Sequence, residues 1–224
     1  MEKNNKKLLV SAIINIIFFV IVTAVFITAF FRPLDTDVQL ITNGWGLFKF
    51  FTVQSNILFG FVALAFGIVE IMMITGKLRS MPRALVILKY VSTVGVTLTF
   101  LTVALYLSPI NSKGYFALFT GTNFFYHFLV PVAAIVTYFL EGEKMPFKCT
   151  FFGMAHFALY GVVYILNGVT HIENGTVAYP TYDWYYIMQN GAAFAVIMVL
   201  VMCGFTYLVS FLLWLPINKK RKGK

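Results

Sequence analysis

The chain has 224 residues, of which 60% are hydrophobic and only 11% are charged, and its mean hydropathy is +0.84. A soluble domain of this size carries far more charge, so the composition excludes that class of protein. The apolar segments are continuous runs that do not alternate with polar residues, which also excludes a membrane-spanning β-barrel. We therefore expect an integral membrane protein built from helices.

Six apolar runs are long enough to cross a bilayer as helices. The first is too long for the apolar region of a signal peptide, and "AFFRPLD" is a poor cleavage site, so we predict a retained helix. Short connections predict a single all-α, polytopic domain, residues 1–224, whose neighbouring helices pack antiparallel. The predicted spans are 8–31, 46–74, 84–108, 119–140, 150–170 and 186–214.

The formal net charge of +9 is distributed unevenly. Under the positive-inside rule, this asymmetry predicts that both termini face the cytoplasm (N-in, C-in), with the plasma membrane as the expected location. We interpret the "NKKRKGK" tail as an orientation signal that contacts lipid headgroups, and we expect no nucleic-acid partner. The basic residues on the predicted cytoplasmic side are Lys3, Lys6, Lys7, Lys77, Arg79, Arg83, Lys144, Lys148, Lys219, Lys220, Arg221, Lys222 and Lys224.

Polar residues inside the spans are the best indication of a site, because polar groups are costly at membrane depth and usually face the bundle interior. In the second span, "FKFFTVQSNILFGFVALAF", Thr52, Ser55 and Asn56 stand at i, i+3 and i+4 and share one helix face. In the fourth span, "GTNFFYHFLVP" places Asn123 and His127 four residues apart on one side.

Thr52 and His127 are expected at similar depth in the outer half of the membrane. At 1.5 Å per residue, Thr52 lies ~9 Å and His127 ~12 Å from the outer ends of their helices. A threonine hydroxyl is a weak nucleophile until a base takes its proton, and neutral imidazole is the usual base. The pair has the parts for acyl transfer, and the positive end of the helix dipole near Thr52 would favour a developing oxyanion. A purely structural role for each residue stays open.

The fifth span carries a polar and aromatic stripe, which consists of His156, Tyr160, Tyr164, Asn167 and His171. This stripe extends beyond any compact ester site, so it favours a different class of protein, one that binds or transports a lipid or small solute without chemistry. A third interpretation is that the polar groups only hold the helices together, which predicts satisfied side chains and no pocket.

Other chemistry has less support in the sequence. A haem bound between His127 and His171 stays open, whereas a zinc site lacks a third ligand and a matching motif, so we predict no metal and no cofactor. Glu70 is the only acidic residue inside a predicted span, and Lys89 lies at a comparable level in the third span. A local ion pair between them is the simplest interpretation, and a proton relay is the alternative.

The loop "HIENGTVAYPTYDWYY" is rich in aromatic and turn-forming residues. We expect it either to cover the outer mouth of the bundle as a lid or to form an aromatic belt at the membrane interface. Asp183 in this loop is the outer acidic residue that we take as the candidate carboxylate for a third catalytic position.

At "FFTVQSNIL", "NFFYHFLVP" and "VAYPTYDW" the chain resembles the androgen-induced protein family. The animal members are six-helix membrane hydrolases that cleave fatty acid esters of hydroxy fatty acids with a threonine nucleophile and a histidine. The resemblance assigns these roles to Thr52 and His127, and it matches the Tyr-Pro before the last helix to Tyr179-Pro180. The chain departs from the family at Phe124, where animal members carry a further histidine.

The resulting hypothesis is a threonine hydrolase that takes a lipid-like acyl ester from the outer leaflet of the membrane. Thr52 would attack the ester carbonyl, and His127 would accept its proton and pass it to the leaving alcohol. The oligomeric state and the acyl chain length stay open. The residues expected to bind substrate or support the pair are Asn123, Ser55, Asn56, Tyr126, Tyr164, Asn167, His171 and Asp183.

Overall fold

The computed structural model describes residues 2–31, 42–179 and 181–219, and within them six helices are long and apolar enough to cross a membrane. This confirms the predicted all-α membrane fold. The helices are α1 (Glu2–Phe31), α2 (Phe51–Ile74), α3 (Arg83–Thr102), α4 (Gly121–Phe124), α5 (Val130–Glu141), α6 (Thr150–Gly153), α7 (Ala155–Thr170) and α8 (Ala192–Asn218). A two-stranded antiparallel hairpin, β1 (Ile172–Glu173) and β2 (Thr176–Val177), follows α7.

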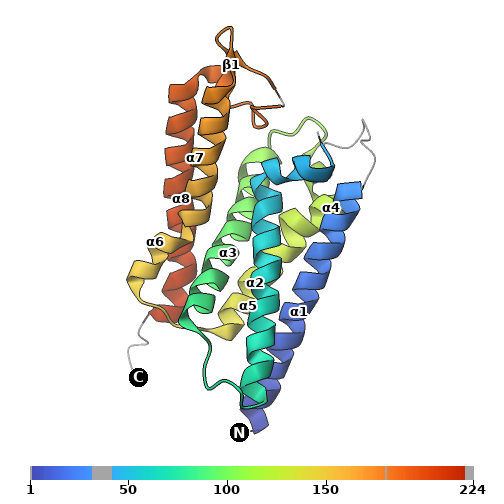
Figure 1. Ribbon diagram of the computed structural model, residues 1–224, viewed down its shortest axis with the longest axis vertical. Helices are drawn as coiled ribbons and strands as arrows, with labels where there is room; N and C mark the ends of the chain where they lie inside the picture. Colours follow the sequence, from blue (N-terminus) through green and yellow to red (C-terminus); the bar gives the residue numbers. More distant parts are fainter. Residues whose placement is uncertain (1, 32–41, 180, 220–224) are drawn as a thin grey trace.

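The helices form two adjoining groups. Helices α1, α2, α3 and α5 pack together, while α7 and α8 lie side by side along the other flank and reach the first group through α3 (Figure 1). The start of α1 and the end of α8 lie at one end of the bundle, which we call the termini end. The β1–β2 hairpin lies at the opposite end, which we call the hairpin end.

The second span begins later than its hydropathy suggests. Residues 46–49 belong to a separate 3₁₀ helix, Gly44–Lys49, and the extended backbone of Phe50 (φ −89°, ψ 129°) breaks the chain before α2. The last span also begins later, because the 3₁₀ turn Met188–Asn190 and Gly191, at φ 90°, precede α8. Both differences arise because aromatic loop residues are as apolar as the helix that follows them.

Two π-helical segments interrupt the helices near the hairpin end. Val103–Leu107 continues α3, and Phe125–Leu129 joins α4 to α5. In the first segment, the N–H of Ser108 donates to the carbonyl of Val103, five residues earlier, at 2.8 Å. Wide turns of this kind are rare and often occur at functional sites, because they leave the regular hydrogen-bond ladder and redirect side chains.

Most polar side chains in the spans are bonded within the bundle. Tyr90 on α3 donates to the carbonyl of Ser210 on α8 at 2.6 Å, and the Ser210 hydroxyl donates to the carbonyl of Thr150 at 2.7 Å. Seven threonines donate to the carbonyl four residues earlier, namely Thr28, Thr93, Thr97, Thr99, Thr137, Thr170 and Thr206. Such bonds remove the cost of a polar group in an apolar medium.

Candidate functional site

Thr52 is the second residue of α2, and its hydroxyl, like those of Thr23, Thr102 and Thr122, does not follow this bonding pattern. Its side chain makes no hydrogen bond to any described residue, and the carbonyl four positions earlier, that of Phe48, accepts from Gln54 at 2.6 Å. The Thr52 amide, one of the first N–H groups of α2, likewise has no acceptor within the described part of the chain. A free hydroxyl and a free amide therefore stand together at the positive end of a helix dipole.

His127 lies in the π-helical segment Phe125–Leu129. Its Nδ1 is 2.8 Å from the carbonyl oxygen of Leu118 in the neighbouring 3₁₀ helix Tyr115–Phe119. A carbonyl only accepts, so we assign the imidazole proton to Nδ1, which leaves the lone pair on Nε2. The backbone thereby fixes both the ring orientation and the tautomer that a general base needs.

Thr52 and His127 line the same cavity, which has a volume of about 190 Å³ and also touches Asn123, Tyr126 and Tyr185. No hydrogen bond joins the two side chains in the structure. Proton transfer between them requires a closer approach or one bridging water, and catalytic hydrogen bonds commonly tighten only when substrate binds. The cavity is thus a shared compartment for the pair, at the hairpin end of the bundle.

Asn56 and Ser55 stabilise the backbone around Thr52 and do not line this cavity. The fully buried Asn56 uses its amide group to donate to the carbonyls of Thr52, at 2.8 Å, and Tyr126, at 3.3 Å. The Ser55 hydroxyl donates to the Thr52 carbonyl at 3.1 Å and is equally close to the hydroxyl of Thr99. Asn56 therefore ties the Thr52 turn to the residue that precedes His127, and its two N–H donors are already engaged.

Asn123 and Tyr126 differ in what they offer the cavity. Both line it, but the Tyr126 hydroxyl donates to the carbonyl of Val22 on α1 at 3.1 Å. Tyr126 therefore contributes a ring wall and links α1 to the π-helical segment. The Asn123 side chain forms no hydrogen bond to the described residues, so its amide is available to a bound molecule.

Asp183 lies away from His127 and organises the loop instead. It is fully buried and accepts from the Tyr164 hydroxyl, from the backbone N–H groups of Ile187 (3.0 Å) and Gln189 (3.2 Å), and from the Gln189 side chain (3.1 Å). With these partners the carboxylate holds the loop in one conformation and has no bond to His127. Its predicted place beside the imidazole is not found in the structure.

Asn167 and His171 hold the same loop onto α7. The Asn167 side chain donates to the carbonyl of Tyr182 at 3.1 Å, and the His171 ring stacks on the Tyr182 ring with centroids 3.8 Å apart. His171 Nδ1 also lies 2.8 Å from the Asn167 carbonyl. Neither residue lines the cavity that Thr52 and His127 share. The neighbouring Pro180 of the Tyr179-Pro180 match lies outside the described residues.

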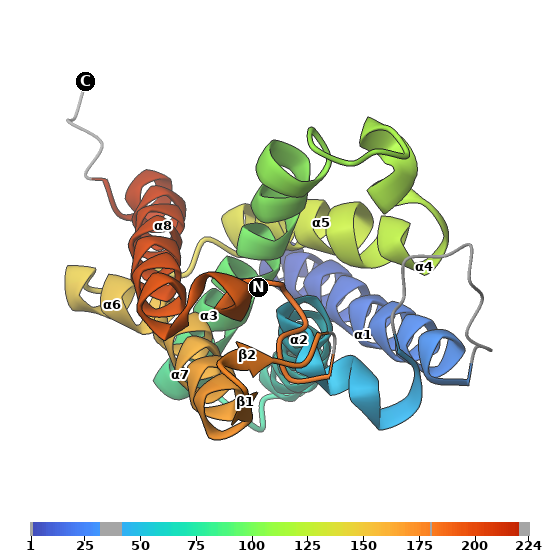
Figure 2. The same cartoon turned by 90° about the horizontal axis from the view of Figure 1, so that it is seen from above.

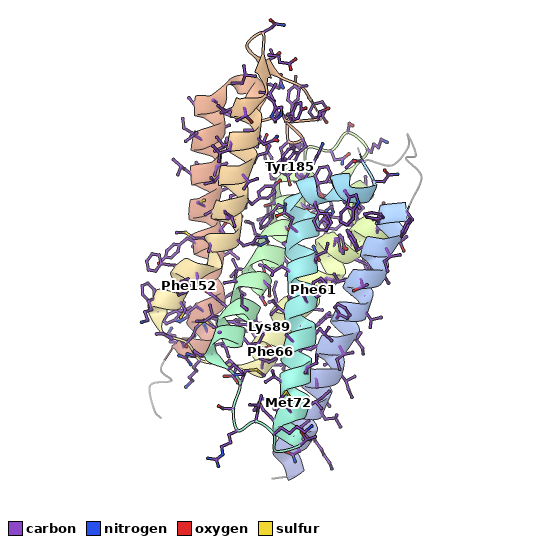
Figure 3. The ribbon with its side chains drawn as sticks, in the orientation of Figure 1. Phe61, Phe66, Met72, Lys89, Phe152 and Tyr185 are labelled. Atoms are coloured by element: carbon purple, nitrogen blue, oxygen red, sulfur yellow. The ribbon has the colours of Figure 1, made fainter. Side chains whose placement is uncertain are left out.

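Tyr185 is a site residue that sequence reasoning missed. Its hydroxyl accepts from the N–H of Phe51 at 3.1 Å, and the loop that carries it runs across the end of α2 (Figures 2 and 3). The ring is partly exposed, but the hydroxyl is enclosed, and this burial raises the pKa of Tyr185 above its ordinary value. Tyr185 therefore stays a neutral O–H donor. The aromatic run "DWYY" was visible in the sequence, but an irregular loop has no period that shows which ring faces inward.

A second cavity of about 220 Å³ adjoins the first one, between α3, α7 and α8. Thr52, Val103, Leu107 and Tyr185 line both cavities. The second cavity is mostly apolar, and its remaining walls come from Phe51, Leu98, Thr99, Thr102, Tyr106, Phe157, Tyr160, Gly161, Tyr164, Ile187, Met198, Val199 and Met202. Thr52 and Tyr185 thus stand where the two cavities meet, and the polar side chains of Asn123 and His127 line only the first one.

The other histidine and the charged residues lie apart from these cavities. The His156 ring packs on Phe51 with centroids 4.9 Å apart, and its buried Nδ1 has no hydrogen-bond partner in the described residues. Lys89 forms its direct ion pair with Glu141, at 3.2 Å, while the expected partner Glu70 joins the same cluster through Asn15. Glu141 is the last residue of α5 and lies one position beyond the predicted span. The hydropathy pattern therefore did not indicate that its side chain faces the bundle interior.

Among the described residues, no group of three or more His, Cys, Asp or Glu side chains is placed to hold a metal ion. No protein-family model, curated protein or solved structure matches this chain. The resemblance noted in the sequence therefore rests on its short motifs, and the case for a function rests on the geometry around Thr52.

The bonds of Asp183 lead to a prediction for the loop. In Asp183→Asn, an amide would replace one carboxylate oxygen that faces N–H donors, so we expect a loss of about 1–3 kcal/mol of loop stability. Hydrogen exchange should show faster exchange at the amides of Ile187 and Gln189. The matched variant Glu173→Gln changes an exposed hairpin residue and should exchange like the wild type. Unchanged protection in Asp183→Asn would contradict the anchoring role.

Proposed function

We propose that the protein is an intramembrane hydrolase of lipid-like acyl esters, with Thr52 as nucleophile and His127 as general base. One observation carries the proposal: a threonine hydroxyl without a hydrogen bond shares a cavity with an imidazole whose Nε2 lone pair is free. Thr102 and Thr122 also lack a hydrogen bond to the described residues, but each lines only one of the two cavities, whereas Thr52 lines both.

The reaction would proceed in two steps. The Thr52 Oγ attacks the ester carbonyl carbon while His127 Nε2 takes the hydroxyl proton, which gives a tetrahedral intermediate. When the intermediate collapses, the ester C–O bond breaks and His127 returns the proton to the leaving alcohol. A water molecule, deprotonated by the same nitrogen, then attacks the acyl–Thr52 ester. The bond from the acyl carbon to Thr52 Oγ breaks, His127 returns the proton to Oγ, and the carboxylic acid is released.

The negative charge on the intermediate would be stabilised by two donors at the start of α2. The Thr52 amide is free, and Tyr185 accepts from the Phe51 amide with its oxygen, which leaves its own proton to donate. Neutral donors fixed before the reaction are effective because they need no reorganisation when charge develops. The Leu118 carbonyl would replace the carboxylate of a catalytic triad, since it holds the Nδ1 proton of His127.

The two cavities support a substrate with two arms that meet at the ester. Thr52 and Tyr185 line both cavities, so an ester carbonyl there would direct one arm into each. The apolar second cavity suits an acyl chain, while Asn123 and Thr122 in the first suit a more polar alcohol portion. The fatty acid esters of hydroxy fatty acids that the resemblance implies have this form.

The membrane location follows from the same proposal. With the basic termini end in the cytoplasm, the cavities would lie in the outer half of the plasma membrane and receive ester from the outer leaflet. The alternative function is a lipid- or solute-binding protein or transporter without chemistry. The alternative is supported by the lack of a hydrogen bond between Thr52 and His127. The polar stripe on α7 supports it less, because Asn167 and His171 of that stripe hold the loop.

Hydrolysis of model acyl esters by purified protein tests the roles of Thr52 and His127. We expect Thr52→Ala and His127→Ala each to lower turnover by about 10²-fold to 10⁴-fold, because one removes the nucleophile and the other the base. Thr206→Ala is the matched control, since that hydroxyl bonds its own helix on α8 and should leave turnover unchanged. Wild-type turnover in a folded Thr52→Ala protein would remove the assignment.

Tyr185→Phe tests the oxyanion donor. Loss of the hydroxyl should lower kcat by about 10²-fold with little change in KM, because the donor acts mainly on the transition state. Tyr186→Phe changes the next ring, which is 61% exposed, and should keep the wild-type kcat. Equal kcat values for the two variants would show that Tyr185 has only a packing role.

A further inference from the structure

The first cavity contains two polar side chains that the proposed reaction does not use. Thr122 and Asn123, neighbours on the short helix α4, both line it, and neither side chain forms a hydrogen bond to the described residues. A polar side chain without a hydrogen bond costs free energy in a membrane protein unless water or a bound molecule satisfies it. In the proposed reaction, the alcohol portion of the ester would lie beside these two side chains.

The first cavity offers no formal charge to a ligand. None of the described residues that line it is Lys, Arg, Asp or Glu, and His127 would act as a neutral imidazole. Lys49, in the 3₁₀ helix before α2, lines neither cavity. Its ammonium donates to the carbonyl of Thr181 at 2.9 Å and lies 6.0 Å from the centre of the Trp184 ring. A carboxylate or phosphate in the cavity would therefore have no cationic partner among the described lining residues.

A negative charge on the alcohol portion would also oppose the reaction. Removal of an ion from water is costly unless a counter-ion replaces its hydration. The same charge would repel the oxyanion that forms at the ester carbonyl, and this repulsion is strong in a site of low polarity. A neutral alcohol portion avoids both costs.

The two unused side chains are matched to hydroxyl groups. The amide of Asn123 both donates and accepts hydrogen bonds, and so does the hydroxyl of Thr122. A carboxylate only accepts, and an alkyl group does neither, whereas a hydroxyl does both. An alcohol portion that carries further hydroxyl groups would therefore use the full hydrogen-bonding capacity of Thr122 and Asn123.

The volume of the first cavity limits the size of the alcohol portion. The cavity measures about 190 Å³. At ~30 Å³ for each water in the liquid, this space corresponds to roughly six waters, and so to an alcohol portion of about six non-hydrogen atoms. Glycerol has about this size, whereas a hydroxy fatty acid with a long chain exceeds it.

We propose that the preferred substrate is a fatty acyl ester of a small uncharged polyol, of the monoacylglycerol type. This inference rests on the proposed hydrolase function and names its substrate class. The acyl chain would lie in the apolar second cavity, and the free hydroxyl groups of the polyol would bond with Asn123 and Thr122 in the first. Esters of hydroxy fatty acids share the two-armed form, but they carry a carboxylate and a second long chain.

Three octanoyl esters with alcohol portions of similar size test this substrate class. They are monooctanoylglycerol, the octanoyl ester of 3-hydroxypropanoate, which is anionic, and pentyl octanoate, which is apolar. We expect kcat/KM for the glycerol ester to exceed that for each of the others by about tenfold or more, because only its hydroxyl groups satisfy Asn123 and Thr122 without a buried charge. Equal or faster turnover of either rival ester would overturn the inference and leave the hydrolase proposal intact.

Asn123→Leu keeps the approximate size of the side chain and removes both of its hydrogen-bonding groups. We expect the ratio of kcat/KM for the glycerol ester to that for the pentyl ester to fall by about tenfold. Asn5→Leu makes the same change at the exposed start of α1 and should keep the wild-type ratio. A wild-type ratio in a folded Asn123→Leu protein would refute the assignment of the polyol to this cavity.

Binding of ethers separates the choice of ligand from hydrolysis, because an ether cannot be cleaved by this reaction. In neutral detergent, the octyl ether of glycerol should raise the thermal midpoint of unfolding in a saturable manner, and at lower concentration than 3-octyloxypropanoate. If this preference holds while no ester is hydrolysed, the hydrolase proposal fails and the site for a polyol lipid is retained. Equal or stronger stabilisation by the propanoate ether would overturn the inference, whatever the turnover.

Discussion

The structure depends on one constraint: a polar group inside a membrane-spanning bundle must find its partner within the protein. Most threonines meet it by bonding the preceding turn of their own helix, and Tyr90 and Ser210 meet it across helices. Thr52 does not, because it stands in the first turn of α2, where the preceding chain has already left the helix. This position leaves the hydroxyl without a hydrogen bond, and the adjoining cavity provides space for a substrate beside it.

The surroundings of Thr52 are assembled from segments distant in the chain. Asn56 joins the Thr52 turn to the π-helical segment that carries His127, and the Leu118 carbonyl sets the histidine tautomer. From the other side, the buried Asp183 fixes the loop that brings Tyr185 to the end of α2. A loop residue, Tyr185, thereby joins the Thr52 amide of α2 as the second proposed oxyanion donor.

Much of this fold could be predicted from the sequence, because membrane helices reveal themselves through long apolar runs. Helical spacing correctly predicted that Thr52, Ser55 and Asn56 share one face. Spacing alone does not show that the Thr52 hydroxyl lines a cavity while the Asn56 amide donates to backbone carbonyls. Tyr185 and Glu141 were missed for another reason: one lies in an irregular loop and the other at a helix end, where neither period nor hydropathy indicates direction. The sequence identified Asp183 as a candidate, but its hydrogen-bond partners are set by the conformation of the loop, which the sequence pattern does not give.

The most direct test of a nucleophilic Thr52 is to find the residue that forms a covalent bond with an electrophile. Purified protein would be treated with an alkyl fluorophosphonate, digested, and its peptides sequenced by mass spectrometry. A catalytic pair predicts a phosphonate adduct on Thr52 that disappears in His127→Ala, because the hydroxyl then lacks its base. An adduct on another residue, or an unmodified Thr52 in protein that still hydrolyses esters, would contradict it.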